Sequence, residues 1–309
     1  MWRDGESVSA VVETQEVMAS THLDIVGPYD LREIALMGFG HRDERSFDGV
    51  MRMAFCLDGG YERQVGVEAR QSDDRLELRA EAVGDPLNDA EVETVRKQVA
   101  RVVSLDHDGE AFHQLCLADP ALSRVHSRAP GFRPALFYSP YEAALWSIIS
   151  ARRARSQAIT LRARMSEQYG ARFELSRSPT MCVPTPSAVL HIESLPGLPA
   201  DRIPRLHAVA EAAERGQLDA QRLRSMAPEA AQAELQQLPG IGPFYSSLIV
   251  VRACGYADAP SLGESRSRAA IQEVYGIDHD LSDAELLDLA DTWRPFRTWV
   301  SVMMRALVV

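Results

Sequence analysis

The run Leu238-Pro239-Gly240-Ile241-Gly242-Pro243-Phe244 has the residue types and spacing of a phosphate-binding turn. Glycines lack a Cβ, so Gly240 and Gly242 can take positive φ and let another backbone come close. The N–H groups that open the next helix have no partner inside that helix and point outward. The run therefore predicts a helix, hairpin and helix that bind a nucleic-acid backbone through Leu238, Gly240, Ile241, Gly242 and Phe244. An ordinary helix-to-helix turn is the alternative.

Charge is distributed unevenly along the chain. Residues 1–120 carry 25 Asp and Glu and 12 Lys and Arg, a net charge of −13, whereas residues 121–309 have a net charge of +2. Between Gly131 and Phe173 there are two glutamates and seven arginines, at positions 133, 152, 153, 155, 162, 164 and 172. This surplus suits contacts with phosphates, and a solvated helix face is the alternative.

Composition limits the class of protein. With 309 residues, 46% hydrophobic and 25% charged, the chain should form two or three compact lobes. It has neither an apolar run of 18 residues nor the basic-then-apolar start of an export signal, so we expect a cytoplasmic protein without membrane contact. The four cysteines are scattered without a Cys-x-x-Cys pair, so we expect no metal, cofactor or disulfide framework.

Local patterns predict an α+β fold in two domains. In residues 1–120, alternating segments at 49–57, 64–69 and 76–81 predict a small antiparallel sheet, accompanied by helices over 29–36, 89–104 and 109–117. In residues 121–309 we predict two all-helical lobes, with the hairpin at 235–255. Helices are expected at 140–150, 156–169, 201–215, 228–237, 246–254, 264–274, 282–290 and 294–307. The proline-rich link 176–186 should be an exposed crossover.

Several motifs together resemble the helix-hairpin-helix DNA glycosylase superfamily, and within it the bacterial inducible 3-methyladenine DNA glycosylases (glycosylase II). They are the hairpin, the loop through Asp258 and Pro260, Trp293-Arg294-Pro295-Phe296-Arg297, Pro140-Tyr141-Glu142-Ala143 and Leu195-Pro196-Gly197-Leu198. The resemblance covers most of the chain. It implies a monomeric enzyme of base-excision repair, which flips a damaged base, expected to be an alkylated purine, out of double-stranded DNA and hydrolyses its N-glycosidic bond.

The family's catalytic group is an aspartate that stabilises the sugar cation, and the spacing from Arg252 and Asp258 places Glu264 at that position. Glutamate is one methylene longer, and a displacement of about 1 Å can cost on the order of 100-fold in rate. The alternative is that Glu264 only interacts favourably with the macrodipole at the start of its helix. Because glutamate replaces the family's aspartate, a second possibility is a relative that binds damaged DNA without glycosylase turnover. The acidic first domain favours a third possibility, an interaction protein that does not touch DNA.

Lysine usage bears on strand cleavage. Relatives that also nick the strand attack the sugar with a lysine two residues after the second hairpin glycine, a position that is Phe244 here. The only lysine in this chain is Lys97, in the first domain. The resemblance therefore implies a monofunctional glycosylase.

Other matched positions concern the substrate. Arg152 falls where relatives insert a residue into the gap left by the flipped nucleotide, and its neighbour Arg153 would contact phosphate. The base pocket would include Phe244, which keeps a ring for stacking, Leu248, which does not, and Arg305, where relatives have tryptophan. A cation at 305 would repel a positively charged purine unless an acid neutralises it. A salt bridge at the end of the last helix is the alternative role of Arg305.

Overall fold

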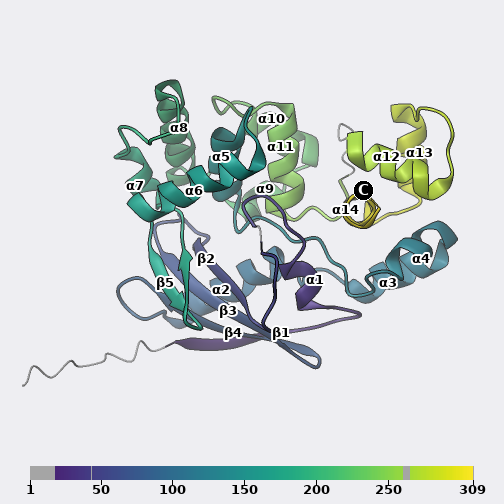
Figure 1. Ribbon diagram of the computed structural model, residues 1–309, viewed down its shortest axis with the longest axis horizontal. Helices are drawn as coiled ribbons and strands as arrows, with labels where there is room; N and C mark the ends of the chain where they lie inside the picture. Colours follow the sequence, from purple (N-terminus) through teal and green to yellow (C-terminus); the bar gives the residue numbers. More distant parts are fainter. Residues whose placement is uncertain (1–17, 43, 260–264, 309) are drawn as a thin grey trace, which may run out of the picture.

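A four-stranded antiparallel sheet forms the base of the molecule in the computed structural model, which describes residues 18–42, 44–259 and 265–308. The strands are β1 (Ala19–Asp24), β2 (Met51–Cys56), β3 (Gln64–Ser72) and β4 (Arg75–Ala82), in the spatial order β1-β4-β3-β2 (Figure 1). Val65, Val67 and Ala69 are fully buried and lie two residues apart along β3, so they share the face that packs in the core. The predicted sheet is confirmed.

Two helices cover this sheet, α1 (Leu31–Ala35) and α2 (Asp89–Val102). The N-cap of α2 forms a capping box, because the Asn88 side chain accepts from the Glu91 N–H and the Glu91 carboxylate accepts from the Asn88 N–H. Val95, Val99 and Val102 of α2 are buried with the sheet residues in one core. This core carries the N-terminal lobe.

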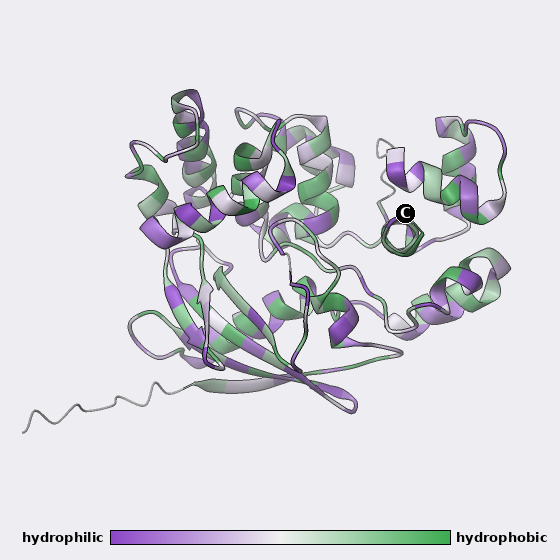
Figure 2. Ribbon diagram, in the orientation of Figure 1, coloured by the Kyte–Doolittle hydropathy of each residue, from purple (hydrophilic) through white to green (hydrophobic). Residues whose placement is uncertain are grey.

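The second core belongs to the helices that surround the hairpin (Figure 1). Its elements are α5 (Pro140–Ser150), α6 (Arg155–Tyr169), α7 (Pro186–Leu190), η1 (Ala200–Arg202), α8 (Ile203–Glu214), α9 (Ala220–Arg224), α10 (Pro228–Leu235), α11 (Pro243–Ile249) and a π-helical turn η2 (Val250–Cys254). All residues of α5 from Pro140 to Ile149 are buried. Figure 2 shows α11 as mainly hydrophobic, whereas hydrophilic and hydrophobic turns alternate along α6. Both helices contribute to the core from one face, α6 through Ala158, Leu161 and Met165 and α11 through Ile249.

A third core joins distant parts of the chain. It brings α3 (Gly109–Ala118) and α4 (Pro120–His126) against α12 (Ser265–Tyr275), α13 (Asp283–Asp291) and α14 (Arg297–Leu307). The Tyr275 hydroxyl donates to Asp119 at 2.6 Å, and Arg128 donates to the Leu307 carbonyl at 3.0 Å. Short α4, which begins at Pro120, was not predicted as a helix.

One prediction about the link 176–186 was wrong. Instead of an exposed crossover, the chain forms a two-stranded hairpin of β5 (Arg172–Leu175) and β6 (Ser178–Met181). Ser176 and Arg177 turn it with φ of 45° and 62°, a conformation usually signalled by Asn or Gly, so the residue types gave no warning. Phe173 packs over Gly66 of β3, where an added Cβ would lie 2.7 Å from the ring. The hairpin thus ties the helical part to the sheet.

A buried ion pair fixes α6 against α5. Arg162 donates to Glu142 at 3.1 Å, and the glutamate side chain is only 1% exposed. Burial raises the pKa of Glu142 above its usual range, and the charge of Arg162 opposes that shift. The pair thus joins the two helices that flank the loop 151–154.

Candidate nucleic-acid interface

The hairpin has the predicted turn, but its two glycines behave differently. Gly240 takes φ of 93°, and a Cβ there would lie 2.9 Å from the Ile148 side chain and 3.1 Å from that of Arg205. Gly242 has φ of −94° and ψ of −175°, which any residue can adopt, and nothing lies within 4 Å of an added Cβ. Only Gly240 therefore needs the left-handed region, whereas Gly242 borders open space that a ligand backbone could enter.

The rest of the hairpin anchors this turn. Ile241 is 3% exposed and its N–H donates to the Leu238 carbonyl at 3.0 Å, while Leu238 packs partly buried against the central core. Gly242 is the N-cap of α11 and supplies no side chain to the helix N–H groups that follow it. Phe244, in that first turn, is 61% exposed. Leu238 and Ile241 thus position the turn, and Gly242 and Phe244 face solvent.

Arginines from other elements gather beside the turn. Arg205 of α8 is the side chain nearest Gly240 after Ile148, and it pairs with exposed Asp201 at 3.2 Å. Arg202 donates to the Ile148 carbonyl at 2.6 Å. Burial, followed by the charges of Arg153 and Arg205, lowers the pKa of Arg202, so the three guanidinium groups are electrostatically coupled. This cluster gives the hairpin surface a positive potential suited to phosphates.

The arginine surplus between residues 131 and 173 is only partly available for phosphates, in contrast to the prediction. Arg133 is 1% exposed and donates to the carbonyls of Ser104, Val26 and Pro28, while Arg162 is held by Glu142. A guanidinium has five donors, so it can satisfy several carbonyls as readily as a phosphate. Arg155, Arg164 and Arg172 also bond to neighbouring backbone or carboxylate groups.

Arg152 differs from its neighbours. It is exposed, takes φ of 57°, and within the described ranges forms no hydrogen bond or ion pair. A left-handed arginine is strained, and such strain often marks a functional position. Arg153 instead donates to the carbonyls of Ile149 and Gly197, at 3.2 and 3.0 Å. Both residues lie in the turn between α5 and α6, not on a helix, so Arg152 projects from a loop.

The last residue of α5, directly before this loop, contacts the hairpin helix. The hydroxyls of Ser150 and Tyr245 are hydrogen-bonded at 3.2 Å. The structure therefore brings the loop of Arg152 next to the first turn of α11. The sequence motifs did not indicate this contact, or the positions of Arg202 and Arg205.

A valine at Gly242 should weaken duplex binding without unfolding the protein. Its side chain would fill the open space where a phosphate backbone is expected, while the local φ and ψ remain allowed for valine. We expect affinity for a duplex with an abasic-site analogue to fall by about 10-fold or more, the loss of one or two charged hydrogen bonds. Equal affinity in a folded Gly242→Val protein would refute phosphate binding by the hairpin. Gly240 is unsuitable for this test because its φ strains any replacement.

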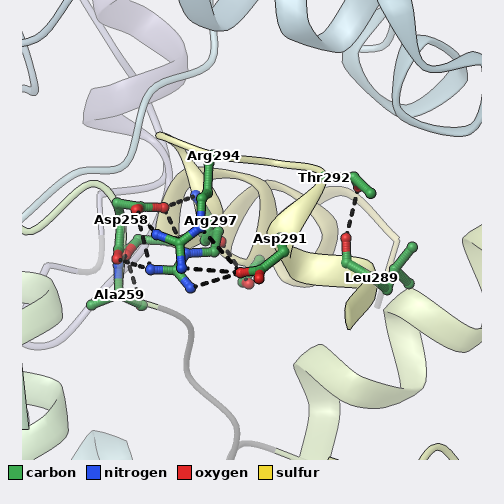
Figure 3. A network of polar contacts seen from close by, with 9 residues as sticks. Asp258, Ala259, Leu289, Asp291, Thr292, Arg294 and Arg297 are labelled. Atoms are coloured by element: carbon green, nitrogen blue, oxygen red, sulfur yellow. Dashed lines mark hydrogen bonds and ion pairs between the residues drawn. The ribbon is translucent and has the colours of Figure 1, made fainter. Parts of the chain in front are cut away.

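Glu264 lies outside the described residues, so its predicted role stays a prediction. Asp258 and Ala259, the last described residues before it, are held by several hydrogen bonds and ion pairs (Figure 3). Asp258 accepts from Arg294 at 2.9 Å and from Arg297 at 2.7 Å. The Thr298 hydroxyl accepts from the Ala259 N–H and donates to its carbonyl, at 2.9 and 2.8 Å. Both arginines of the Trp293–Arg297 run thus anchor Asp258.

The predicted base-pocket residues come from two elements. Phe244 and Leu248 are four residues apart on α11 and so share a face, with Leu248 half-buried against the core. Arg305 is exposed near the end of α14. It is linked to η2 by charge, because burial and then the charges of Arg305 and Arg42 lower the pKa of Arg252 to about 9.

An aromatic side chain from the N-terminal lobe joins this region without having been predicted. The guanidinium carbon of Arg252 lies 3.5 Å from the centre of the Phe39 ring, and Phe39 packs edge-on to Phe137 at 4.8 Å. Arg252 also donates to the Ala135 carbonyl at 2.6 Å. These contacts fasten the loop around Phe39 to the helix that follows the hairpin.

In the described part of the chain, neither a metal-binding cluster nor a lysine lies at the hairpin. Among those residues there is no group of three or more His, Cys, Asp or Glu side chains that could hold a metal ion. Lys97 lies on α2 in the N-terminal lobe, where it pairs with Glu93 at 3.5 Å. None of the helices in the described ranges is long and apolar enough to cross a bilayer.

Comparisons with known proteins show similarity to DNA glycosylases. No protein-family model matches the chain. The DNA-3-methyladenine glycosylase of Bacillus subtilis (strain 168) is 19% identical over 224 residues, which cover 70% of this chain and 73% of the relative. This likeness is distant but spans most of both proteins.

Solved structures give the stronger likeness. A 3-methyladenine DNA glycosylase from Archaeoglobus fulgidus superposes with a TM-score of 0.72 at 21% identity, covering 92% of this chain and 96% of that one. The Clostridium acetobutylicum 8-oxoguanine glycosylase/lyase in complex with double-stranded DNA gives a TM-score of 0.65 at 17% identity, covering 94% and 96%. The chain therefore has the fold of the helix-hairpin-helix DNA glycosylase superfamily.

Proposed function

We propose that this protein is a monofunctional DNA glycosylase that removes a damaged purine from duplex DNA. The observation that carries the proposal is the juxtaposition of an open hairpin turn at Gly242 with the exposed, strained Arg152. A backbone-binding turn beside a side chain that can enter the duplex is the arrangement needed to hold a flipped nucleotide. The relatives named above act on damaged bases, which supports the same activity here.

The chemistry we propose is hydrolysis of the N-glycosidic bond. As the base leaves, positive charge develops on the sugar, and the carboxylate of Glu264 stabilises that charge and orients the attacking water. Asp258, six residues before this carboxylate in the sequence, is held by Arg294 and Arg297. With Phe244 where a lyase would have lysine, and Lys97 in the other lobe, the product is an intact abasic site.

Arg152 fills the gap in the duplex under this proposal. An arginine can stack on the neighbouring base pair and still reach a phosphate. Replacing Arg152 with alanine should weaken binding to a duplex with a flipped-out abasic analogue by about 10-fold or more, because unstacking costs a few kcal/mol that the plug offsets. Binding to undamaged duplex should change much less, and fluorescence anisotropy on both duplexes measures the ratio.

The control is Arg205→Ala, which removes an exposed charge beside the hairpin without touching the loop of Arg152. It should reduce affinity for damaged and undamaged duplex by the same factor. If Arg152→Ala behaves identically, Arg152 is part of the general basic surface and the plug role is wrong.

The activity itself is tested by single-turnover base release from duplexes that carry methylated, deaminated or bulky purine lesions. We expect release of at least one base, with strand cleavage only after alkali, since no amine attacks the sugar. Release of no base from any lesion, together with tight duplex binding, would instead identify a DNA-damage-binding relative.

A further inference from the structure

A polar groove lies beside the loop of Arg152. Its volume is about 340 Å³, and it runs between α6 and the turn that contains Gly197. The lining residues are Arg153, Gln157, Thr160, Leu161, Arg164 and Gly197. Neither the hairpin motif nor the predicted base pocket includes this groove.

One face of α6 forms the wall. Gln157, Thr160 and Arg164 are spaced by three and four residues, so their side chains lie in a row along the helix. Gln157 and Thr160 are exposed. No acidic side chain is among the lining residues, so the groove carries the charge of its two arginines. The wall thus combines positive charge with neutral hydrogen-bonding groups.

Both arginines are oriented by backbone carbonyls of the opposite wall. Arg164 donates to the Pro196 carbonyl, and Arg153 donates to the Gly197 carbonyl at 3.0 Å. Arg153 uses a second nitrogen to donate to the Ile149 carbonyl of α5. The remaining nitrogens of Arg153 and Arg164 form no bond to protein groups in the described ranges. Pre-oriented guanidinium groups with spare donors are suited to phosphate oxygens.

The chain connects this groove directly to the hairpin. Ser150 contacts Tyr245 of the hairpin helix, Arg152 projects from the middle of the loop, and Arg153 lines the groove. Arg153 belongs both to the groove and to the arginine cluster beside the hairpin. A duplex held by the hairpin therefore lies within reach of the groove.

We infer that the groove along α6 binds backbone phosphates of the duplex next to those held by the hairpin. The inference rests on the proposed function, because it requires that the protein bind duplex DNA. Phosphate contacts carry no base identity, so the groove would fix the position of the duplex without selecting the base opposite the lesion.

A single introduced negative charge tests the groove. Thr160→Glu places a carboxylate in its wall, so affinity for a duplex with an abasic analogue should fall about 10-fold in low salt. The slope of log K against log salt should become shallower by about one unit per lost phosphate contact. The matched control is Thr94→Glu on α2, since the hydroxyls of Thr94 and Thr160 both donate to the carbonyl four residues before them, at 2.9 and 3.1 Å. Thr94→Glu should leave affinity unchanged.

Neutral methylphosphonates locate the phosphates that the groove contacts. In wild-type protein, replacing these phosphates one at a time should weaken binding, and in Thr160→Glu the same replacements should have little further effect. Absence of such coupling at every position, or equal affinity of Thr160→Glu and wild type, would overturn the assignment while leaving the glycosylase proposal intact. Failure of wild-type protein to bind any duplex would overturn both.

Discussion

Replacing Glu264 with glutamine should reduce base release by about 100- to 1,000-fold while leaving duplex binding equal or tighter. Losing one group aimed at charge that develops in a transition state typically has this effect. Binding should not suffer, because a carboxylate near phosphates repels them and the amide does not. The measurement is single-turnover base release beside an equilibrium binding titration.

Glu273→Gln is the matched control, since it makes the same chemical change at an exposed position on α12. It should retain wild-type activity. If Glu264→Gln also retains activity, the carboxylate only meets the helix macrodipole and the catalytic assignment is wrong. Faster release by Glu264→Asp would indicate that the natural glutamate is a poorly placed catalyst, with its carboxylate one methylene too far.

Removing Arg162 should destabilise the protein by about 3–5 kcal/mol, because Arg162→Met leaves the Glu142 carboxylate buried without its cation. Urea denaturation gives the free energy of unfolding. The control is Arg172→Met, which breaks an exposed pair with Glu174 at 3.3 Å and should change stability by less than about 1 kcal/mol. Adding Glu142→Leu to Arg162→Met should recover much of the loss.

The effect of Arg162→Met should depend on pH. Burial already raises the pKa of Glu142 in the folded protein, and loss of the nearby cation raises it further. A group with a raised folded pKa stabilises the fold below its unfolded pKa, about 4.3 for glutamate, and loses that contribution as pH rises through the folded value. The variant should therefore come closest to wild type near pH 4 and diverge as pH rises. Equal differences at pH 4 and pH 8 would contradict a buried, ionised Glu142.

Elements with local signals were predictable. Asn88 caps α2, Ser139 and Pro140 start α5, and Ser282 caps α13. Each helix start is therefore indicated by the residue types next to it. The β5–β6 hairpin was missed because its turn uses Ser176 and Arg177, and its stability comes from packing on the sheet. Sequence periodicity does not indicate packing against residues that are distant along the chain.

The same division applies to the candidate site. The hairpin turn was predictable because its glycine spacing is local. The contact of Phe39 with Arg252 was not, because more than 200 residues separate the two in sequence. Arginine content was misleading for a different reason, since donors that suit phosphates also satisfy buried carbonyls, as they do around Arg133.

The third core sets the order in which the chain can complete its fold during synthesis. Hydrogen bonds that close it join Tyr275 to Asp119 and Arg128 to Leu307, across 156 and 179 residues. Helices α3 and α4 leave the ribosome long before α12 and α14 are synthesised. Phe112 and Leu122 therefore cannot be buried in the third core until α12 and α14 have formed. Nascent chains that stop short of α14 would present that apolar surface to chaperones and proteases.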